Sequence, residues 1–91
     1  MFPMTNTSWY SSLPTINMTE TGKNINSLRI KNHMSVKEMQ QIFGFTTPQA
    51  VYKWIHGKNL PTLDNIVILA HIFHVTVDEI LVTEEKVIAI E

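Results

Sequence analysis

Hydrophobic residues recur every three or four positions in five separate segments of the chain, which predicts five amphipathic helices. The strongest periodicity lies between residues 63 and 73, directly after a Leu-Pro-Thr sequence that suits a helix start. The side chains expected to pack inward are, in chain order, Ile25 and Leu28; Val36, Met39, Ile42 and Phe43; Ala50, Val51, Trp54 and Ile55; Leu63, Ile66, Val67, Ala70 and Phe73; and Val77, Ile80 and Leu81.

Capping residues place the ends of the second helix. Ser35 precedes Glu38 by three positions, so the side chain of each is expected to bond the backbone amide of the other. The helix therefore starts at Ser35 and ends near Phe43, because Gly44 suits the left-handed conformation that often ends a helix. The first helix is expected to start at a Thr19 or Thr21 cap and to end at Asn32 and His33, and the fifth is expected to start at Thr76.

A tight turn separates the second helix from a third, an arrangement between residues 35 and 54 that is typical of a helix-turn-helix unit binding DNA. Either Thr46 or Thr47 is expected to cap the third helix, and Pro48 suits its first turn because no amide hydrogen is needed there. With the apolar side chains inward, the outer face of this helix consists of Pro48, Gln49, Tyr52 and Lys53.

The two ends of the chain lack the helical period. Residues 1–18 are rich in Thr, Ser and Asn, and we interpret them as a mostly unstructured, flexible arm. Residues 19–82 form the expected domain, and residues 83–91 form an acidic and apolar tail. Within this tail, residues 87–90 fit three alternatives: a frayed end, a strand that pairs with a twin subunit, or a continuation of the last helix.

Composition narrows the class of protein. Ninety-one residues with 44% hydrophobic content suffice for one small core, and the absence of cysteine excludes disulfides and thiolate metal sites. The longest apolar run, residues 66–70, is far shorter than the roughly 20 residues of a membrane span, so we expect a soluble protein. The first basic residue is Lys23, so the N-terminus lacks the layout of a secretory signal, which favours the cytoplasm.

No motif in the chain indicates catalysis or a cofactor. The sequence has neither a phosphate-binding glycine loop nor a Gly-x-Ser-x-Gly motif, so we expect no enzyme, no cofactor and no small-molecule ligand. His71 and His74 lie three residues apart on the fourth helix, but two histidines leave a zinc site short of ligands. We therefore expect no metal, and His74 is also acceptable as a helix-ending residue of positive φ.

The net charge of −1 conceals two oppositely charged halves. Residues 20–60 contain six basic and two acidic residues, a balance of +4, whereas residues 61–91 contain one basic and six acidic residues, a balance of −5. A basic face toward phosphate and an acidic far side would produce this segregation, because the field at the duplex depends more on the near face than on the total charge.

Several separately placed motifs resemble the Cro/C1-type (XRE) helix-turn-helix family, in particular small regulators of low-GC Gram-positive bacteria. The resemblance covers residues 21–81 and implies an all-α, compact five-helix bundle of the lambda-repressor-like DNA-binding type. It rests on these motifs: Met34-Ser35-Val36-Lys37-Glu38-Met39, Gly44, Gln49-Ala50-Val51-Tyr52-Lys53-Trp54, Gly57-Lys58, Pro61-Thr62-Leu63-Asp64-Asn65 and Val75-Thr76-Val77-Asp78-Glu79-Ile80-Leu81.

The resemblance further implies a transcriptional regulator, expected to be a repressor, that inserts the third helix (residues 47–56) into the major groove of a double-stranded operator. We expect a homodimer on two half-sites, because one module with six basic residues should bind a single site weakly at physiological salt. The expected base contacts are Thr47, Pro48, Gln49, Tyr52 and Lys53, and the expected phosphate contacts are Arg29, Ser35, Lys37, Thr46 and Lys58.

Three departures from the family pattern affect the site. Val36 stands where a glutamine usually contacts phosphate, and the turn near Phe45 is about one residue longer than usual. Ile55 replaces a glutamate that often pairs with an arginine, so Arg29 is expected either to bind phosphate or to pair with Glu38. The alternative to DNA binding is a protein-interaction module or antitoxin-like partner that retains the fold and binds another protein through its apolar C-terminus.

Overall fold

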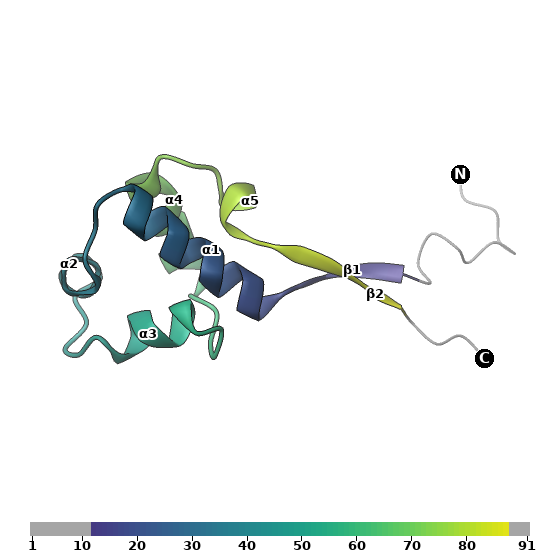
Figure 1. Cartoon of the computed structure of the whole chain (residues 1–91), viewed down its shortest axis with the longest axis horizontal. Coiled ribbons are helices and arrows are strands. Elements are labelled where there is room, and N and C mark those ends of the chain that lie inside the picture. The colour runs from purple at the N-terminus through teal and green to yellow at the C-terminus, as the bar shows by residue number, and fades with distance from the viewer. Residues whose placement is uncertain (1–11, 88–91) are drawn as a thin grey trace, which may run out of the picture.

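The computed structural model describes residues 12–87, in which five helices form the body of the protein and two short strands form a ribbon (Figure 1). Predictions for residues 1–11 and 88–91 lie outside the described residues. None of the described helices is long and apolar enough to cross a bilayer. The elements in chain order are β1 (Ser12–Ile16), α1 (Met18–Lys31), α2 (Val36–Ile42), α3 (Gln49–Ile55), α4 (Leu63–Phe73), α5 (Val77–Ile80) and β2 (Thr83–Val87).

The capping box predicted for α2 is confirmed. The Glu38 amide donates to Ser35 Oγ over 3.0 Å, and the Ser35 amide donates to Glu38 Oε1 over 2.9 Å. Thr76 caps α5 in the same way, also as predicted. The prediction that Thr19 or Thr21 caps α1 is wrong, because the cap is Asn17, whose Oδ1 accepts from the Glu20 amide.

Four helices end in the same Schellman motif, with one residue in the left-handed conformation after the last turn. At the end of α2, the Phe45 amide donates to the Gln40 carbonyl and the Gly44 amide donates to the Gln41 carbonyl. The left-handed residues after α1, α2, α3 and α4 are His33, Gly44, Gly57 and His74, with φ between 55° and 70°. The predicted stops at His33, Gly44 and His74 are therefore confirmed.

Each helix contributes at least one side chain to the core, although Ile42 of α2, which was predicted to pack inward, is 47% exposed. Trp54 of α3 is 4% exposed and meets Phe43 and Phe45 edge to face, with ring centroids 5.1 and 5.6 Å apart. The residues of the buried cluster are Ile25, Met39, Val51, Trp54, Ile66, Leu69, Phe73 and Ile80.

The inward face predicted for α4 is partly wrong. Leu63 and Val67 are 80% and 61% exposed, whereas Leu69 is fully buried. The buried stripe is Ile66, Leu69 and Phe73, a spacing of three and four residues, so the helix is rotated from the predicted orientation. Apolar residues occur on several sides of α4, and periodicity alone therefore chose the wrong one.

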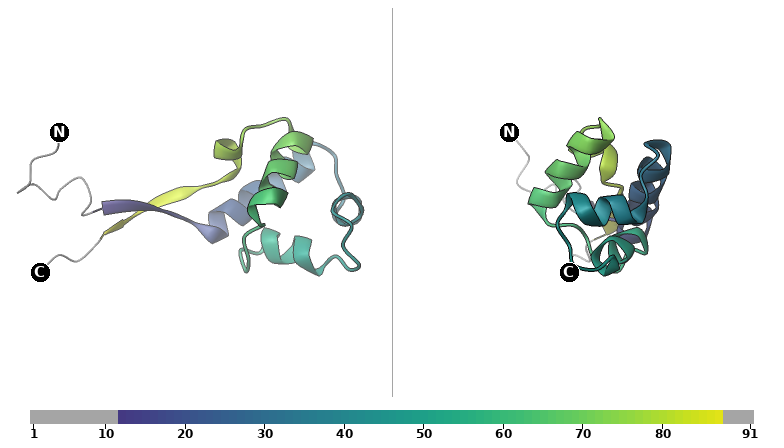
Figure 2. Two further views of the ribbon diagram at one scale, coloured as in Figure 1. Left: turned by 180° about the vertical axis from the view of Figure 1, so that it is seen from behind. Right: turned by 90° about the vertical axis from the view of Figure 1, so that its left-hand side faces the viewer.

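The prediction of an all-α fold is wrong, because β1 and β2 form an antiparallel ribbon that extends away from the helices (Figures 1 and 2). Part of the predicted unstructured arm is thus a strand, and the described part of the tail pairs with its own chain. Ser12 lies opposite Val87 and Ile16 lies opposite Thr83. The two strands lie at opposite ends of the chain, so no local hairpin signal precedes their pairing.

Buried polar bonds anchor the base of the ribbon to α1. Thr21 is fully buried, and its Oγ1 accepts from the Val82 amide over 2.9 Å and lies 3.3 Å from the Val82 carbonyl oxygen, to which it donates. The Asn17 amide also donates to the Val82 carbonyl, over 2.8 Å. The ribbon therefore begins from a fixed point on the helical body.

Candidate nucleic-acid interface

The helices α2 and α3 cross steeply at the end of the molecule farthest from the ribbon (Figure 1). On α3, Val51 and Trp54 point into the core, while Gln49, Tyr52 and Lys53 are exposed. The aromatic contacts of Trp54 with Phe43 and Phe45 tie α3 to the turn that precedes it. The outer face of α3 is consequently a polar surface on a rigidly held helix.

The start of α3 differs from the prediction. Its N-cap is Pro48, which makes no side-chain cap bond, whereas Thr47 Oγ1 accepts from the Gln49 amide at 3.4 Å. The Thr47 hydroxyl keeps its hydrogen available for donation, because it acts only as an acceptor in this bond. Thr46 and Thr47 are both exposed beside the first turn of α3, and Pro48 is half-buried.

One turn further along α3, Tyr52 is 42% exposed and stacks on His56, with ring centroids 6.0 Å apart and planes 21° from parallel. This contact orients the tyrosine ring along the helix surface. Lys53 follows Gln49 by four residues, so their side chains lie next to each other on the same face. Of the five predicted base-contacting residues, Thr47, Gln49, Tyr52 and Lys53 are thus exposed together.

Two glycines set the position of α3 relative to α1, and sequence analysis missed their role. A Cβ atom built on Gly22 of α1 would lie 2.7 Å from the Ile55 carbonyl oxygen and even closer to that of Trp54. A Cβ on Gly57 would lie 2.8 Å from Cα of Thr19. The backbones therefore touch where α1 passes the end of α3. The sequence signal for this contact was a glycine within a predicted helix.

The predicted phosphate contacts separate into two groups. Ser35, Lys37, Thr46 and Lys58 are exposed. Ser35 Oγ accepts from the Glu38 amide over 3.0 Å. Hydrogen bonding from the Ser35 amide, and then from its side chain, holds the pKa of Glu38 below its usual range. The remaining residue of the predicted set, Arg29, is different.

Arg29 makes hydrogen bonds within the protein. Its Nη1 donates to the Met34 carbonyl over 2.8 Å, and its Nε and Nη2 both donate to Oδ1 of Asn26. The predicted pairing with Glu38 is wrong, because the Glu38 carboxylate accepts from Ser35 instead. Arg29 therefore fixes the turn between α1 and α2, and its contact with phosphate stays a prediction.

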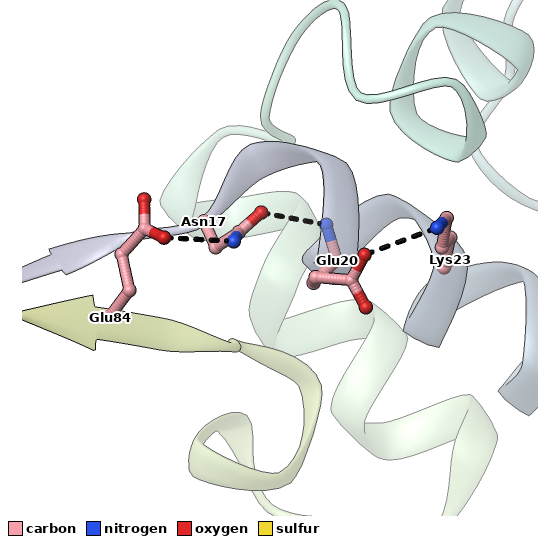
Figure 3. Close-up of polar contacts among 4 residues, drawn as sticks. All are labelled: Asn17, Glu20, Lys23 and Glu84. Carbon is pink, nitrogen blue, oxygen red and sulfur yellow. Dashed lines mark hydrogen bonds and ion pairs between the residues drawn. The ribbon is translucent and has the colours of Figure 1, made fainter.

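The ribbon, whose strand β2 contains Glu84 and Glu85, lies away from α2 and the start of α3 (Figure 2). At its base, Asn17 Nδ2 donates to Glu84 Oε2 over 3.1 Å, and Glu20 pairs with Lys23 over 3.2 Å (Figure 3). Lys37 and Lys53, in contrast, belong to the two helices at the opposite end. Residues 12–87 contain no group of three potential metal ligands and no pocket.

A family model described as helix-turn-helix, of the Cro/C1 type, matches residues 25–80. The match contains α2, the turn and α3, which form the exposed surface described above. No curated protein and no solved structure matches the chain. The family is one of DNA-binding regulators and not of enzymes. Because the matched residues make up more than half of this chain, the chain belongs to the Cro/C1-type helix-turn-helix family of DNA-binding regulators.

Proposed function

We propose that this protein is a transcriptional repressor that binds operator DNA sequence-specifically as a homodimer, with α3 in the major groove. The observation that carries the proposal is the division of α3, in which Val51 and Trp54 are buried while Gln49 and Lys53 are exposed at the surface. A helix whose polar face is free of the core can enter a groove without disturbing the fold.

Gln49 is the principal candidate for base recognition. Its side-chain amide can accept from N6 of adenine and donate to N7, a bidentate pair that contributes about 1–3 kcal/mol of discrimination against other bases. Lys53, one turn on, can donate to guanine or to phosphate. The Thr47 hydroxyl can donate to phosphate, while the rings of Pro48 and Tyr52 offer apolar contact to a thymine methyl.

Phosphate contacts position α3 in the groove. Ser35 and Lys37 lie at the start of α2, Thr46 lies in the turn, and Lys58 lies just after α3. All four side chains are exposed. Neutralising phosphate with such residues releases counterions, so the affinity should fall as salt concentration rises.

We infer a dimer because one helix-turn-helix module of this size should bind a single DNA site weakly. A helix-turn-helix dimer binds two half-sites about 34 Å apart, which multiplies the contacts of one module. A bound dimer needs only to occupy its operator to prevent transcription. The −5 balance of residues 61–91 supports contact through α3, because repulsion from phosphate disfavours contact through that half of the chain.

The test is selection from a random double-stranded DNA pool at about 100 mM salt, where nonspecific phosphate binding is already weakened. We expect the wild-type protein to enrich an inverted repeat. The Lys53→Ala variant should enrich it less, whereas Lys23→Ala, a matched loss of one lysine near the ribbon, should leave enrichment intact. The absence of enrichment by folded wild-type protein would contradict the proposal.

A protein-interaction module is the second candidate, and the exposed Leu63 and Val67 favour it. These side chains lie one turn apart on α4 and form an apolar surface of the kind that partners cover. The same selection separates the two functions. A folded protein that enriches no DNA sequence, yet loses capture of a protein partner in a Leu63→Ser variant, would be an interaction module.

A further inference from the structure

The ribbon has one strand edge that is blocked and one that is open. The Asn17 amide donates to the Val82 carbonyl, so Asn17 and Val82 form a hydrogen-bonded pair at the base of the ribbon. From there to the tip of the ribbon, non-hydrogen-bonded and hydrogen-bonded residue pairs alternate. Pro14 and Glu85 therefore form a non-hydrogen-bonded pair, and their backbone groups point outward. Because proline lacks an amide hydrogen, the outer edge of β1 is interrupted at its centre.

The outer edge of β2 has no such interruption. By the same alternation, the amides and carbonyls of Thr83, Glu85 and Val87 point away from β1. Among residues 12–87, only β1 pairs with β2, and all five residues of β2 are exposed. An isolated two-stranded ribbon is marginally stable in water, so an added strand would stabilise it considerably.

We propose that the open edge of β2 pairs with β2 of a second copy of this chain, antiparallel and centred on Glu85, to form a four-stranded sheet. The proposal rests on the dimeric DNA binding proposed above and names the surface that joins the two copies. The partner is a second copy because the strand is self-complementary in charge. In this register, Glu84 lies opposite the partner's Lys86, and Lys86 lies opposite the partner's Glu84.

Charge selects this register over its neighbours. When two copies of β2 pair antiparallel about a two-fold axis, one residue of β2 must lie opposite the same residue of the second copy. Centring on Glu84 or on Lys86 would place two like charges opposite each other and would form no ion pair between the described residues. Centring on Glu85 gives two Glu–Lys pairs in non-hydrogen-bonded positions, where opposing side chains are closest.

The cost of this register is one Glu85 pair across the symmetry axis. Ser12 Oγ donates to Glu85 Oε2 over 2.8 Å, which draws that carboxylate toward β1 and away from the open edge. Glu84 accepts from Asn17 through one oxygen and keeps the other for the partner's Lys86. The two Glu–Lys attractions therefore outweigh the one repulsion between the Glu85 side chains. The dimer is expected to bind more tightly when an uncharged residue replaces Glu85.

The test is the dimer dissociation constant measured by analytical ultracentrifugation without DNA. We expect Glu84→Lys and Lys86→Glu each to weaken the dimer about tenfold or more, since two attractive cross-strand pairs become repulsive. The double variant should restore wild-type affinity, and Glu85→Gln should tighten the dimer about threefold. Asp64→Lys and Lys31→Glu are charge-matched controls on exposed helix positions and should have no effect.

Glu85→Pro tests the backbone pairing itself. It removes an amide hydrogen that points outward and leaves the bonds between β1 and β2 in place, so it should abolish self-association without reducing helicity. A monomeric wild-type protein, or single variants that dimerise normally, would overturn the proposal. In the DNA selection, the Glu85→Pro variant should still enrich a single half-site but should no longer enrich the inverted repeat. This result would show that the dimer surface can fail while α3 still reads DNA.

Discussion

Replacing Gly22 with alanine should destabilise the protein, although alanine favours helices more than any other residue. The new methyl group would lie 2.7 Å from the Ile55 carbonyl oxygen and closer still to that of Trp54, so the backbones of α1 and α3 must separate by more than roughly 0.7 Å to reach ordinary contact. Overpacking of this kind costs about 3 kcal/mol when backbone atoms stand on the far side, and the helix gains about 1 kcal/mol from alanine. The expected net loss of stability is therefore about 2 kcal/mol.

Thermal unfolding followed by circular dichroism measures this loss. A net change of about 2 kcal/mol should lower the Tm by roughly 8–16 °C in a domain of this size. Ser27→Ala, at an exposed position of α1, is the matched control and should leave the Tm unchanged or slightly higher. A Tm for Gly22→Ala at or above the wild-type value would refute the close approach of α1 and α3.

Other substitutions test the helix ends and their connections. Gly44→Ala should cost about 1–2 kcal/mol in urea unfolding, because φ is +69° there although no atom crowds the position; an unchanged midpoint would contradict the left-handed turn. Asn24→Ala should cost about 1 kcal/mol, since its Nδ2 donates to the Glu79 and Ile80 carbonyls, and faster amide exchange in α5 would report the loss. The lowered pKa of Glu38 means that its contribution is present above pH 4.5, its unfolded value, and is lost as pH falls through the folded value. The Tm difference between wild type and Glu38→Gln should accordingly narrow below pH 4.5, and a constant difference would contradict the lowered pKa of Glu38.

Local signals made the helix-turn-helix unit predictable. The capping box of Ser35 and Glu38 and the left-handed Gly44 depend on residues only a few positions apart, so the sequence contains all the atoms that decide them. Trp54 was also correctly assigned to the core, because it occupies the inward helical position. Which of the predicted side chains contact DNA stays a prediction.

Features that depend on distant residues were not predictable. The orientation of α4 depends on which of several apolar sides meets the other helices, and Leu63 and Val67 were wrongly assigned inward. The internal role of Arg29 depends on the path of the backbone at Met34, which the sequence does not specify. The ribbon joins segments from opposite ends of the chain, and Thr21, its buried anchor, was interpreted only as a helix cap.

The most direct test of DNA reading by α3 is a comparison of Gln49→Ala with wild type on a selected operator and on its single-base variants. Wild-type protein should prefer adenine at one position of each half-site by about 5- to 150-fold, the ratio that corresponds to 1–3 kcal/mol. The Gln49→Ala variant should lose that preference alone and keep its preferences elsewhere. An unchanged preference at every position would contradict the reading of bases by α3 through Gln49.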